Sequence, residues 1–229
     1  MKTIVFLLIG LFFINSDVVV AQDLSTNTSR RISEGTIYYD IFFTTGNNAA
    51  AQVEKNLGGT QTVSLKGYMS RVDIANQQFL QSTIIDAKAG NIKLLKTLGG
   101  QQYLIEVNRE NWDELNRKYE NAKVVFGEEF KNIAGFNCQK ALVTFKDGTS
   151  SAVFFTRELI AEHRDFEYAF KSIPGLVMEN ETAVGNNKVT YSVSKISFNI
   201  VPTSKFELPK SGYRVMTYEE SKQINNRGN

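Results

Sequence analysis

The sequence contains one cysteine and one histidine among its 229 residues. Cys138 therefore has no partner for an intramolecular disulfide, and its apolar neighbours Ile133 and Phe136 favour a buried, unreactive thiol. Metal sites in proteins use several nitrogen, sulfur or oxygen ligands at set spacings, and His163 has no such companions in the sequence. We therefore expect no metal site and no cofactor.

A strong charge of either sign is also missing. Lysine and arginine total 26 and aspartate and glutamate total 24, which gives a formal net charge of +2. This balance is too mild to predict binding to nucleic acid or to an anionic membrane surface. The sequence has only three prolines and no linker rich in Pro, Gly or Ser, so one folded domain is expected after the N-terminal segment.

One long apolar run stands at the N-terminus. Lys2 precedes Ile4–Ile14, polar residues follow, and the small residues Val19 and Ala21 occupy the −3 and −1 positions of a cleavage site. A bilayer core needs about 20 apolar residues, so the run is about half as long as a transmembrane anchor. The pattern predicts a cleavable signal peptide over residues 1–21 and a soluble protein, periplasmic or secreted, with no transmembrane anchor after cleavage.

The rest of the chain divides into a polar, flexible segment (22–33), a single domain (34–218) and a polar tail (219–229) that is expected to fray. Alternating apolar residues and Gly-containing turns predict strands at 35–44, 60–65, 68–74, 81–86, 91–98, 101–107, 141–145, 151–156 and 190–200. Helices are predicted at 47–57 and 108–122. This succession indicates an antiparallel meander rather than βαβ units.

The predicted helix over 108–122 has an apolar stripe formed by Trp112, Leu115 and Tyr119. Asn111, followed three residues later by Glu114, resembles a capping box at its start. The single tryptophan is therefore interpreted as an anchor for core packing rather than as a platform on which a ligand stacks.

Two features of the strands depart from simple alternation. In the strand over 190–200 the apolar phase slips after Val193, which predicts either a bulge or a strand that changes which of its faces is covered. Several strands carry bulky apolar residues on both faces, as at Ile84 and Ile85, Leu94 and Leu95, and Phe154 and Phe155. Either the sheet curls around a helix that fills it, or it encloses an apolar cavity for a ligand. From periodicity alone, the packed core is the simpler interpretation.

No catalytic motif is identified. The charged segment 162–165, which contains His163, is interpreted as a solvated surface. A hydrolase that uses His163 is kept as a third hypothesis, although no Gly-x-Ser-x-Gly motif occurs. Arg71 and Asp73 lie on one face of a predicted strand, where a surface ion pair accounts for them. We therefore expect a protein that is not an enzyme and has no catalytic residue.

Four segments in order along the chain resemble the patterns of the secreted GLPGLI family of bacterial envelope proteins and of related exported proteins. They are Phe130–Ala141, Phe154–Leu159, Ile173–Val177, and Phe206–Pro209 with Gly212 and Tyr213. The chain departs from the GLPGLI pattern because Ser-Ile-Pro replaces Gly-Leu-Pro and an upstream Gly-Pro-Tyr-Lys-Phe run is missing, so it resembles the related group more. Pro174-Gly175 is interpreted as a type II turn in which Gly supplies a positive φ.

These exported proteins are similar in layout to the LolA-type lipoprotein-carrier fold, an incomplete antiparallel barrel whose concave apolar face binds acyl chains. The resemblance therefore implies a β-rich α+β fold in which an antiparallel sheet curls into an incomplete barrel around one or two helices. It implies no catalytic residue, and fold similarity alone is a weak guide to the ligand.

The leading functional hypothesis is a non-enzymatic envelope protein that binds a lipid or another apolar molecule, with lipid or lipoprotein acyl chains as partners. The residues predicted to line its cavity are Tyr39, Phe43, Tyr103, Phe155 and Tyr191. The alternative is a structural or protein-interaction module whose barrel is filled by its own helices and whose partner is another envelope protein.

Overall fold

The computed structural model describes residues 29–45, 58–76, 80–98, 100–184 and 187–227, and within them twelve strands form one large mixed sheet. The predicted signal peptide and the predicted helix over 47–57 lie outside these residues. The strands of the large sheet are β2 (Glu34–Thr45), β3 (Gly59–Lys66), β4 (Met69–Asn76), β5 (Leu80–Asp86), β6 (Asn91–Leu98), β7 (Gln101–Val107), β8 (Lys123–Ile133), β9 (Phe136–Thr144), β10 (Ser150–Thr156), β12 (Leu176–Val184), β13 (Asn187–Ser197) and β14 (Arg214–Thr217).

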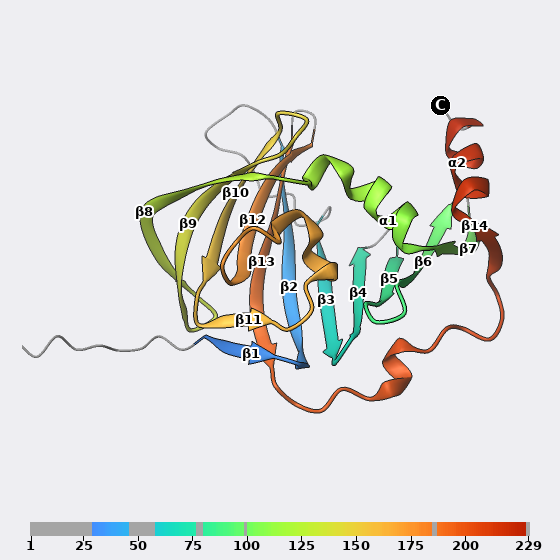
Figure 1. Cartoon of the computed structure of the whole chain (residues 1–229), viewed down its shortest axis with the longest axis horizontal. Helices are drawn as coiled ribbons and strands as arrows, with labels where there is room; N and C mark the ends of the chain where they lie inside the picture. Colours follow the sequence, from blue (N-terminus) through green and yellow to red (C-terminus); the bar gives the residue numbers. More distant parts are fainter. Residues whose placement is uncertain (1–28, 46–57, 77–79, 99, 185–186, 228–229) are drawn as a thin grey trace, which may run out of the picture.

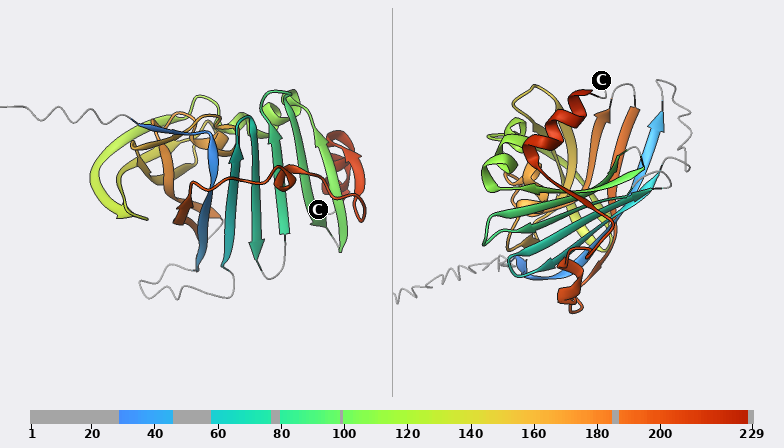
Figure 2. Two further views of the ribbon diagram at one scale, coloured as in Figure 1. Left: turned by 90° about the horizontal axis from the view of Figure 1, so that it is seen from below. Right: turned by 90° about the vertical axis from the view of Figure 1, so that its right-hand side faces the viewer.

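The sheet follows the order β14-β7-β6-β5-β4-β3-β2-β13-β12-β10-β9-β8, and only the pair β14–β7 is parallel. Two meanders, β2–β7 and β8–β10, are therefore joined by β12 and β13, which insert between them. The half that contains β8, β9 and β10 curls around while the half that contains β4–β7 stays more open (Figures 1 and 2). The expected incomplete barrel is confirmed.

Helical segments occupy the concave side of this sheet. Helix α1 (Arg109–Asn116) continues into the 3₁₀ turn η1 (Arg117–Tyr119), and a second 3₁₀ segment, η2 (Asp165–Phe170), lies inside the curl (Figures 1 and 2). Two further helical segments, η3 (Thr203–Phe206) and α2 (Tyr218–Arg227), follow later in the chain. No helix among the described residues is long and apolar enough to cross a membrane.

A helix is confirmed at the predicted place, but it ends earlier than the predicted 108–122, because α1 stops at Asn116 and η1 at Tyr119. Its capping also differs from the prediction. Asn108 is the N-cap, and its side-chain oxygen accepts a hydrogen bond from the backbone N–H of Asn111 at 2.8 Å. Asn111 is therefore inside the helix and is not its cap. Of the predicted stripe, Trp112 and Tyr119 are half-buried, whereas Leu115 is exposed. A stripe of three residues cannot be told from a stripe of two by spacing alone.

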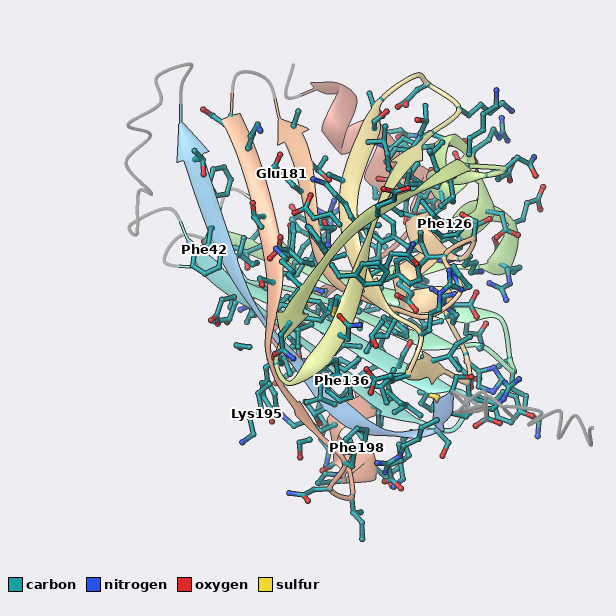
Figure 3. All side chains as sticks on the ribbon, turned by 90° about the vertical axis from the view of Figure 1, so that its left-hand side faces the viewer. Phe42, Phe126, Phe136, Glu181, Lys195 and Phe198 are labelled. Carbon is teal, nitrogen blue, oxygen red and sulfur yellow. The ribbon has the colours of Figure 1, made fainter. Side chains whose placement is uncertain are left out.

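The strand patterns were predicted well where alternation is strict. In β2, Ile37, Tyr39 and Ile41 are buried, and Phe42 projects from the outer face (Figure 3). Along β13, the pairing with β2 shifts register between Val193 and Lys195, as the slipped phase predicted. Strand β8 was missed, because its alternation is broken by Gly127-Glu128-Glu129, where the pairing with β9 also shifts register.

Both ends of the domain are more ordered than expected. Residues 30–32, placed in the flexible segment, form β1 (Arg30–Ile32), which pairs in parallel with β11 (Leu159–Ala161) and buries Ile32. The tail expected to fray forms α2, which begins with a capping box. The Thr217 N–H donates to the Glu220 carboxylate (2.7 Å), and the Glu220 N–H donates to the Thr217 hydroxyl (3.2 Å).

The chain after β13 explains why some strands are apolar on both faces. This segment crosses the outer side of the open half of the sheet before it reaches β14 at the far edge (Figure 2). Val201 and Phe206 pack there on Ile84 and Leu95, whereas Ile85 packs in a separate cluster with Ile92 and Ile105. Neither of the two sequence-based interpretations included this third arrangement, in which a distant segment of the chain covers the outer face.

Arg71 and Asp73 help to hold that crossing in place. Their ion pair is confirmed at 2.8 Å, but it is not an isolated surface pair. The Arg71 guanidinium also donates to the carbonyl oxygen of Lys205 (2.9 Å), and the Ser82 hydroxyl lies within hydrogen-bonding distance of both side chains. The pair therefore joins β4 and β5 to η3.

Gly175 is required for a reason other than the predicted one. Its φ is not positive, so Pro174-Gly175 is not the expected type II turn. A Cβ atom at Gly175 would lie 2.0 Å from the backbone oxygen of Thr156, far inside van der Waals contact. Glycine is thus needed because two backbone segments approach closely at this point, where β10 ends and β12 begins.

We expect Gly175→Ala to lower the free energy of unfolding by about 3 kcal/mol, because the added methyl group must displace backbone rather than a flexible side chain. The matched control is Gly127→Ala in β8, where the nearest atom to the new Cβ would be 3.5 Å away. That variant should change stability by less than about 0.5 kcal/mol. Chemical denaturation of both variants checks this, and equal losses would contradict the steric explanation.

Candidate functional site

A hollow lies between η1, η2 and the concave face of the sheet. Its first part, here called the Trp112 cavity, has a volume of about 230 Å³. Its walls come from α1, η1, η2, β2, β3, β12 and β13, so segments far apart in the sequence meet there. Aromatic rings dominate the lining: Tyr39, Trp112, Tyr119, Phe166, Tyr168, Phe170 and Tyr191.

A second part, here called the Phe145 cavity, adjoins the first and has a volume of about 490 Å³. The two parts share five lining residues: Tyr119, Ala169, Phe170, Asn180 and Tyr191. We call the two together the groove. The edge-to-face contact of Tyr119 with Phe145, with ring centroids 4.9 Å apart, forms one wall of the second part.

Arg164 fixes the position of η2 beside the groove. Its Nε donates to the carboxylate of Glu167 at 2.6 Å, and both side chains are largely buried. Its two terminal nitrogens donate to three backbone carbonyl oxygens of the following loop, those of Phe170 (2.9 Å), Lys171 (3.2 Å) and Ile173 (2.6 Å). The carbonyl oxygens of Phe170 and Ile173 also accept backbone N–H bonds, from Ile173 and Gly175, so the planar guanidinium reinforces the turn that follows η2.

Glu167 is the one charged residue in the lining of the Trp112 cavity. Burial raises its pKa, and the attraction and hydrogen bond of Arg164 oppose that rise. The backbone is non-helical at this residue (φ −116°, ψ 46°), which interrupts η2. The carboxylate is thus already engaged inside the protein and is not a free anionic group in the groove.

Asp165 ties α1 to η2. Its carboxylate accepts hydrogen bonds from Arg109 at 2.8 Å and from Lys171 at 2.9 Å. Burial on its own would raise the pKa of Asp165, but these two bonds outweigh burial, and the pKa lies below its usual value. The two helical segments that border the groove are therefore joined by a charged cluster.

Two of the five predicted lining residues are brought together in the groove. Tyr39 and Tyr191 both line the Trp112 cavity, and the Tyr39 hydroxyl donates to the carbonyl oxygen of Val177 at 3.2 Å. Burial raises the pKa of both phenols, so both stay protonated. Whether these rings contact a ligand stays a prediction.

The other three predicted residues lie elsewhere. Phe155 has no exposed surface and belongs to the core with Val143 and Val153. Tyr103 packs in a cluster on the open half of the sheet, with Ile105 among its neighbours. Phe43 continues the inner face of β2, but it is not among the residues that line either part of the groove. Strand alternation identifies a face and does not show where the covering helices end.

Sequence reasoning missed the contribution of η1 and η2. Phe166, Ala169 and Phe170 come from a short aromatic segment whose conformation the pattern did not define. Trp112 was interpreted as a packing anchor, and it does pack beside the cluster of Ile85 and Ile105, but it also lines the groove. The density of aromatic residues over 166–170 was the signal in the sequence that could have identified this wall.

The other residues considered for chemistry, His163 and Cys138, lie outside the groove. The prediction that 162–165 is a solvated surface is wrong, because Arg164 and Asp165 are largely buried. The ring of His163 lies against that of Tyr68, with centroids 4.3 Å apart and planes tilted by 31°, and neither residue lines the groove. Cys138 is buried, as predicted, and burial raises its pKa to about 11, so it is not an activated thiolate. Among the described residues, no three His, Cys, Asp or Glu side chains gather closely enough to hold a metal ion.

Comparison of the sequence with models of known families and with curated proteins finds no match, so the resemblance to GLPGLI proteins has no support from a family model. Three similar solved structures are PNGF-II (TM-score 0.49, 11% identity, 83% of this chain and 33% of that one), the lipoprotein LppX of Mycobacterium tuberculosis (0.38, 9%, 73% and 89%) and the MucA/MucB complex of Pseudomonas aeruginosa (0.39, 8%, 77% and 56%). The chain thus spans about a third of the length of PNGF-II.

The indole N–H of Trp112 is buried and has no hydrogen-bond partner among the described residues. An unpaired buried donor costs about 1–3 kcal/mol. We expect Trp112→Phe to change the free energy of unfolding by less than about 1 kcal/mol, because removal of this N–H offsets the smaller ring. Trp112→Ala should cost about 3 kcal/mol. Denaturation curves of the two variants check this, and an equal loss in both would show that the N–H is satisfied.

The Asp165 cluster predicts a pH-dependent contribution to stability. At neutral pH, Asp165→Asn should lower the free energy of unfolding by about 2 kcal/mol, because two charge-assisted hydrogen bonds are weakened. A lowered folded-state pKa gives stability that is complete above the unfolded-state pKa of about 4 and is lost as the pH falls through the folded-state value. The difference between the variant and the native protein should therefore shrink in acid.

The measurement is a set of unfolding curves between neutral pH and about pH 2, the range that spans ordinary carboxyl pKa values. Glu128→Gln, at an exposed position of β8, serves as the control and should have little effect at any pH. A loss in Asp165→Asn that is the same at all pH values would rule out the charge of Asp165 as its source.

Proposed function

We propose that this chain is an exported protein that binds an apolar ligand, such as a lipid or an acyl chain, in the groove, and that it is not an enzyme. The observation that carries the proposal is the space left between η2 and the concave face of the sheet, which aromatic side chains line. Pockets for small molecules are concave and mostly apolar, with a few polar groups that set orientation. Gln61, Asn116 and Asn180 are such groups in the Trp112 cavity.

The size of the groove supports an elongated ligand. Small-molecule pockets commonly measure about 300–1,000 Å³. The Trp112 cavity alone, at about 230 Å³, is below that range, and the adjoining Phe145 cavity, at about 490 Å³, is within it. A chain that occupies both would bury methylene groups that contribute about 0.8 kcal/mol each.

The alternative, a barrel filled by its own helices, describes part of the arrangement. Helix α1 and η2 do cover the concave side, and Phe166 from η2 packs in the core with Ile37 and Tyr39. The covering is incomplete, because the groove remains beside Tyr119 and Tyr191. A self-filled module would have no use for this space, which is why we favour a ligand.

Binding is favoured over catalysis by the groups in the groove. Its carboxylate, Glu167, is held by Arg164, and burial raises the pKa of the phenols of Tyr39 and Tyr191. His163, on which the hydrolase hypothesis depended, stacks on Tyr68 outside the groove. These groups suit the orientation of a ligand better than proton transfer to it.

The test is titration of the purified mature chain with N-phenyl-1-naphthylamine, a neutral apolar probe that fluoresces when it leaves water. The native protein should bind it saturably. Ala169→Trp should weaken binding by about tenfold or more, equivalent to about 1.4 kcal/mol, because Ala169 lines both parts of the groove.

The matched control is Ala152→Trp in β10, because Ala152 does not line either part of the groove. It adds the same ring and should leave binding unchanged. Thermal unfolding establishes that both variants fold. Native protein that fails to bind the probe, or a folded Ala169→Trp variant that binds it as well as the native protein, would contradict the proposal.

A further inference from the structure

The two charged residues that line the groove lie in different parts of it and differ in their partners. Glu167 lines the Trp112 cavity and is paired with Arg164. Lys118, in η1, lines the Phe145 cavity and forms no ion pair with the described residues. The groove is therefore electrostatically asymmetric: one end has a carboxylate paired with a guanidinium group, and the other has an ammonium group that forms no ion pair with the described residues.

The position of the Lys118 ammonium is defined by the ring beneath it. Its Nζ lies 4.8 Å from the centroid of Tyr119, and Tyr119 lines both parts of the groove. The carboxylate of Asp147 interacts electrostatically with Lys118. That carboxylate accepts hydrogen bonds from the backbone N–H and the hydroxyl of Thr149, within its own turn. The ammonium thus stands at the Phe145 cavity with donors available for a ligand.

We propose that the ligand is an amphiphile with an anionic head group, and that Lys118 binds this head at the Phe145 cavity while the apolar tail extends along Tyr119 and Tyr191 into the Trp112 cavity. This inference rests on the proposed function, since it specifies the head group and the direction of a ligand in the same groove. The shared chemistry is a carboxylate or phosphate on a single apolar chain.

The opposite orientation is disfavoured by the groups at the other end. An anion placed in the Trp112 cavity would lie near the carboxylate of Glu167, and four of the five N–H donors of Arg164 already serve that carboxylate and three backbone carbonyl groups. Its own burial would then lack a compensating partner. At the Phe145 cavity, the exposed Lys118 and the hydroxyl of Ser150 lie at the border with solvent, where an anion keeps part of its hydration.

The experiment compares two ligands of equal chain length, decanoate and decan-1-ol, as competitors of N-phenyl-1-naphthylamine on the purified mature chain. The native protein should bind decanoate about tenfold more tightly than decan-1-ol. Lys118→Gln should remove this preference by weakening decanoate alone, and Lys118→Arg should retain it because the charge is kept. Lys88→Gln, an exposed lysine in the turn between β5 and β6, makes the same change in net charge away from the groove and should have no effect.

The outcomes separate this inference from the proposed function. If both ligands compete with equal affinity, or if Lys118→Gln keeps the preference for decanoate, apolar binding stands and the assignment of the head group to Lys118 is wrong. If neither ligand nor the probe binds the native protein, the proposed function fails and this inference fails with it. A preference that Lys118→Gln removes and Lys88→Gln leaves intact supports both.

Discussion

The groove depends on the way in which one guanidinium group organises η2. Arg164 pairs with Glu167 and donates hydrogen bonds to the carbonyl oxygens of Phe170 and Ile173. These bonds fix a short, kinked 3₁₀ segment that is not part of a regular α-helix. Both carbonyl oxygens also accept a backbone N–H bond, from Ile173 and Gly175, and the planar guanidinium adds a charged donor to each of them. The chain then passes directly to Gly175, whose close approach to Thr156 sets where β12 enters the sheet.

The hydrogen bonds of Arg164 fix η2 locally. Contact with the sheet along the whole length of η2 is therefore not required to hold it in place. Asp165 adds a second connection by joining η2 to Arg109 of α1. The two helical segments therefore form a wall that faces the concave surface of β2, β12 and β13 and leaves space between Tyr119 and Tyr191. A binding site arises here from incomplete packing, in a region where the surrounding backbone is fixed by hydrogen bonds and ion pairs.

The apolar side chains of the sheet are buried in a different way in each of its two halves. In the half that contains β8, β9 and β10, curvature turns the inner face onto a core that includes Val143 and Phe155. In the open half, the segment after β13 crosses the outer face and buries Ile84 under Phe206, guided by Arg71. Apolar residues of the sheet thus serve packing in both halves. They border a groove only where η1 and η2 stand away from the sheet.

The sequence by itself determined most of the strands, although not β8 or β12, together with the helix that contains Trp112, the slip near Val193 and the burial of Cys138, because alternation, turn residues and local hydrophobicity act over a few neighbouring positions. Only the tertiary structure decided that Tyr39 and Tyr191 meet in a groove and that Phe155 is enclosed in the core, since which part of an apolar face stays uncovered depends on distant segments. The same holds for Gly175, Arg71 and Arg164. Their partners lie across the fold or in irregular loops, and no local pattern specifies such contacts.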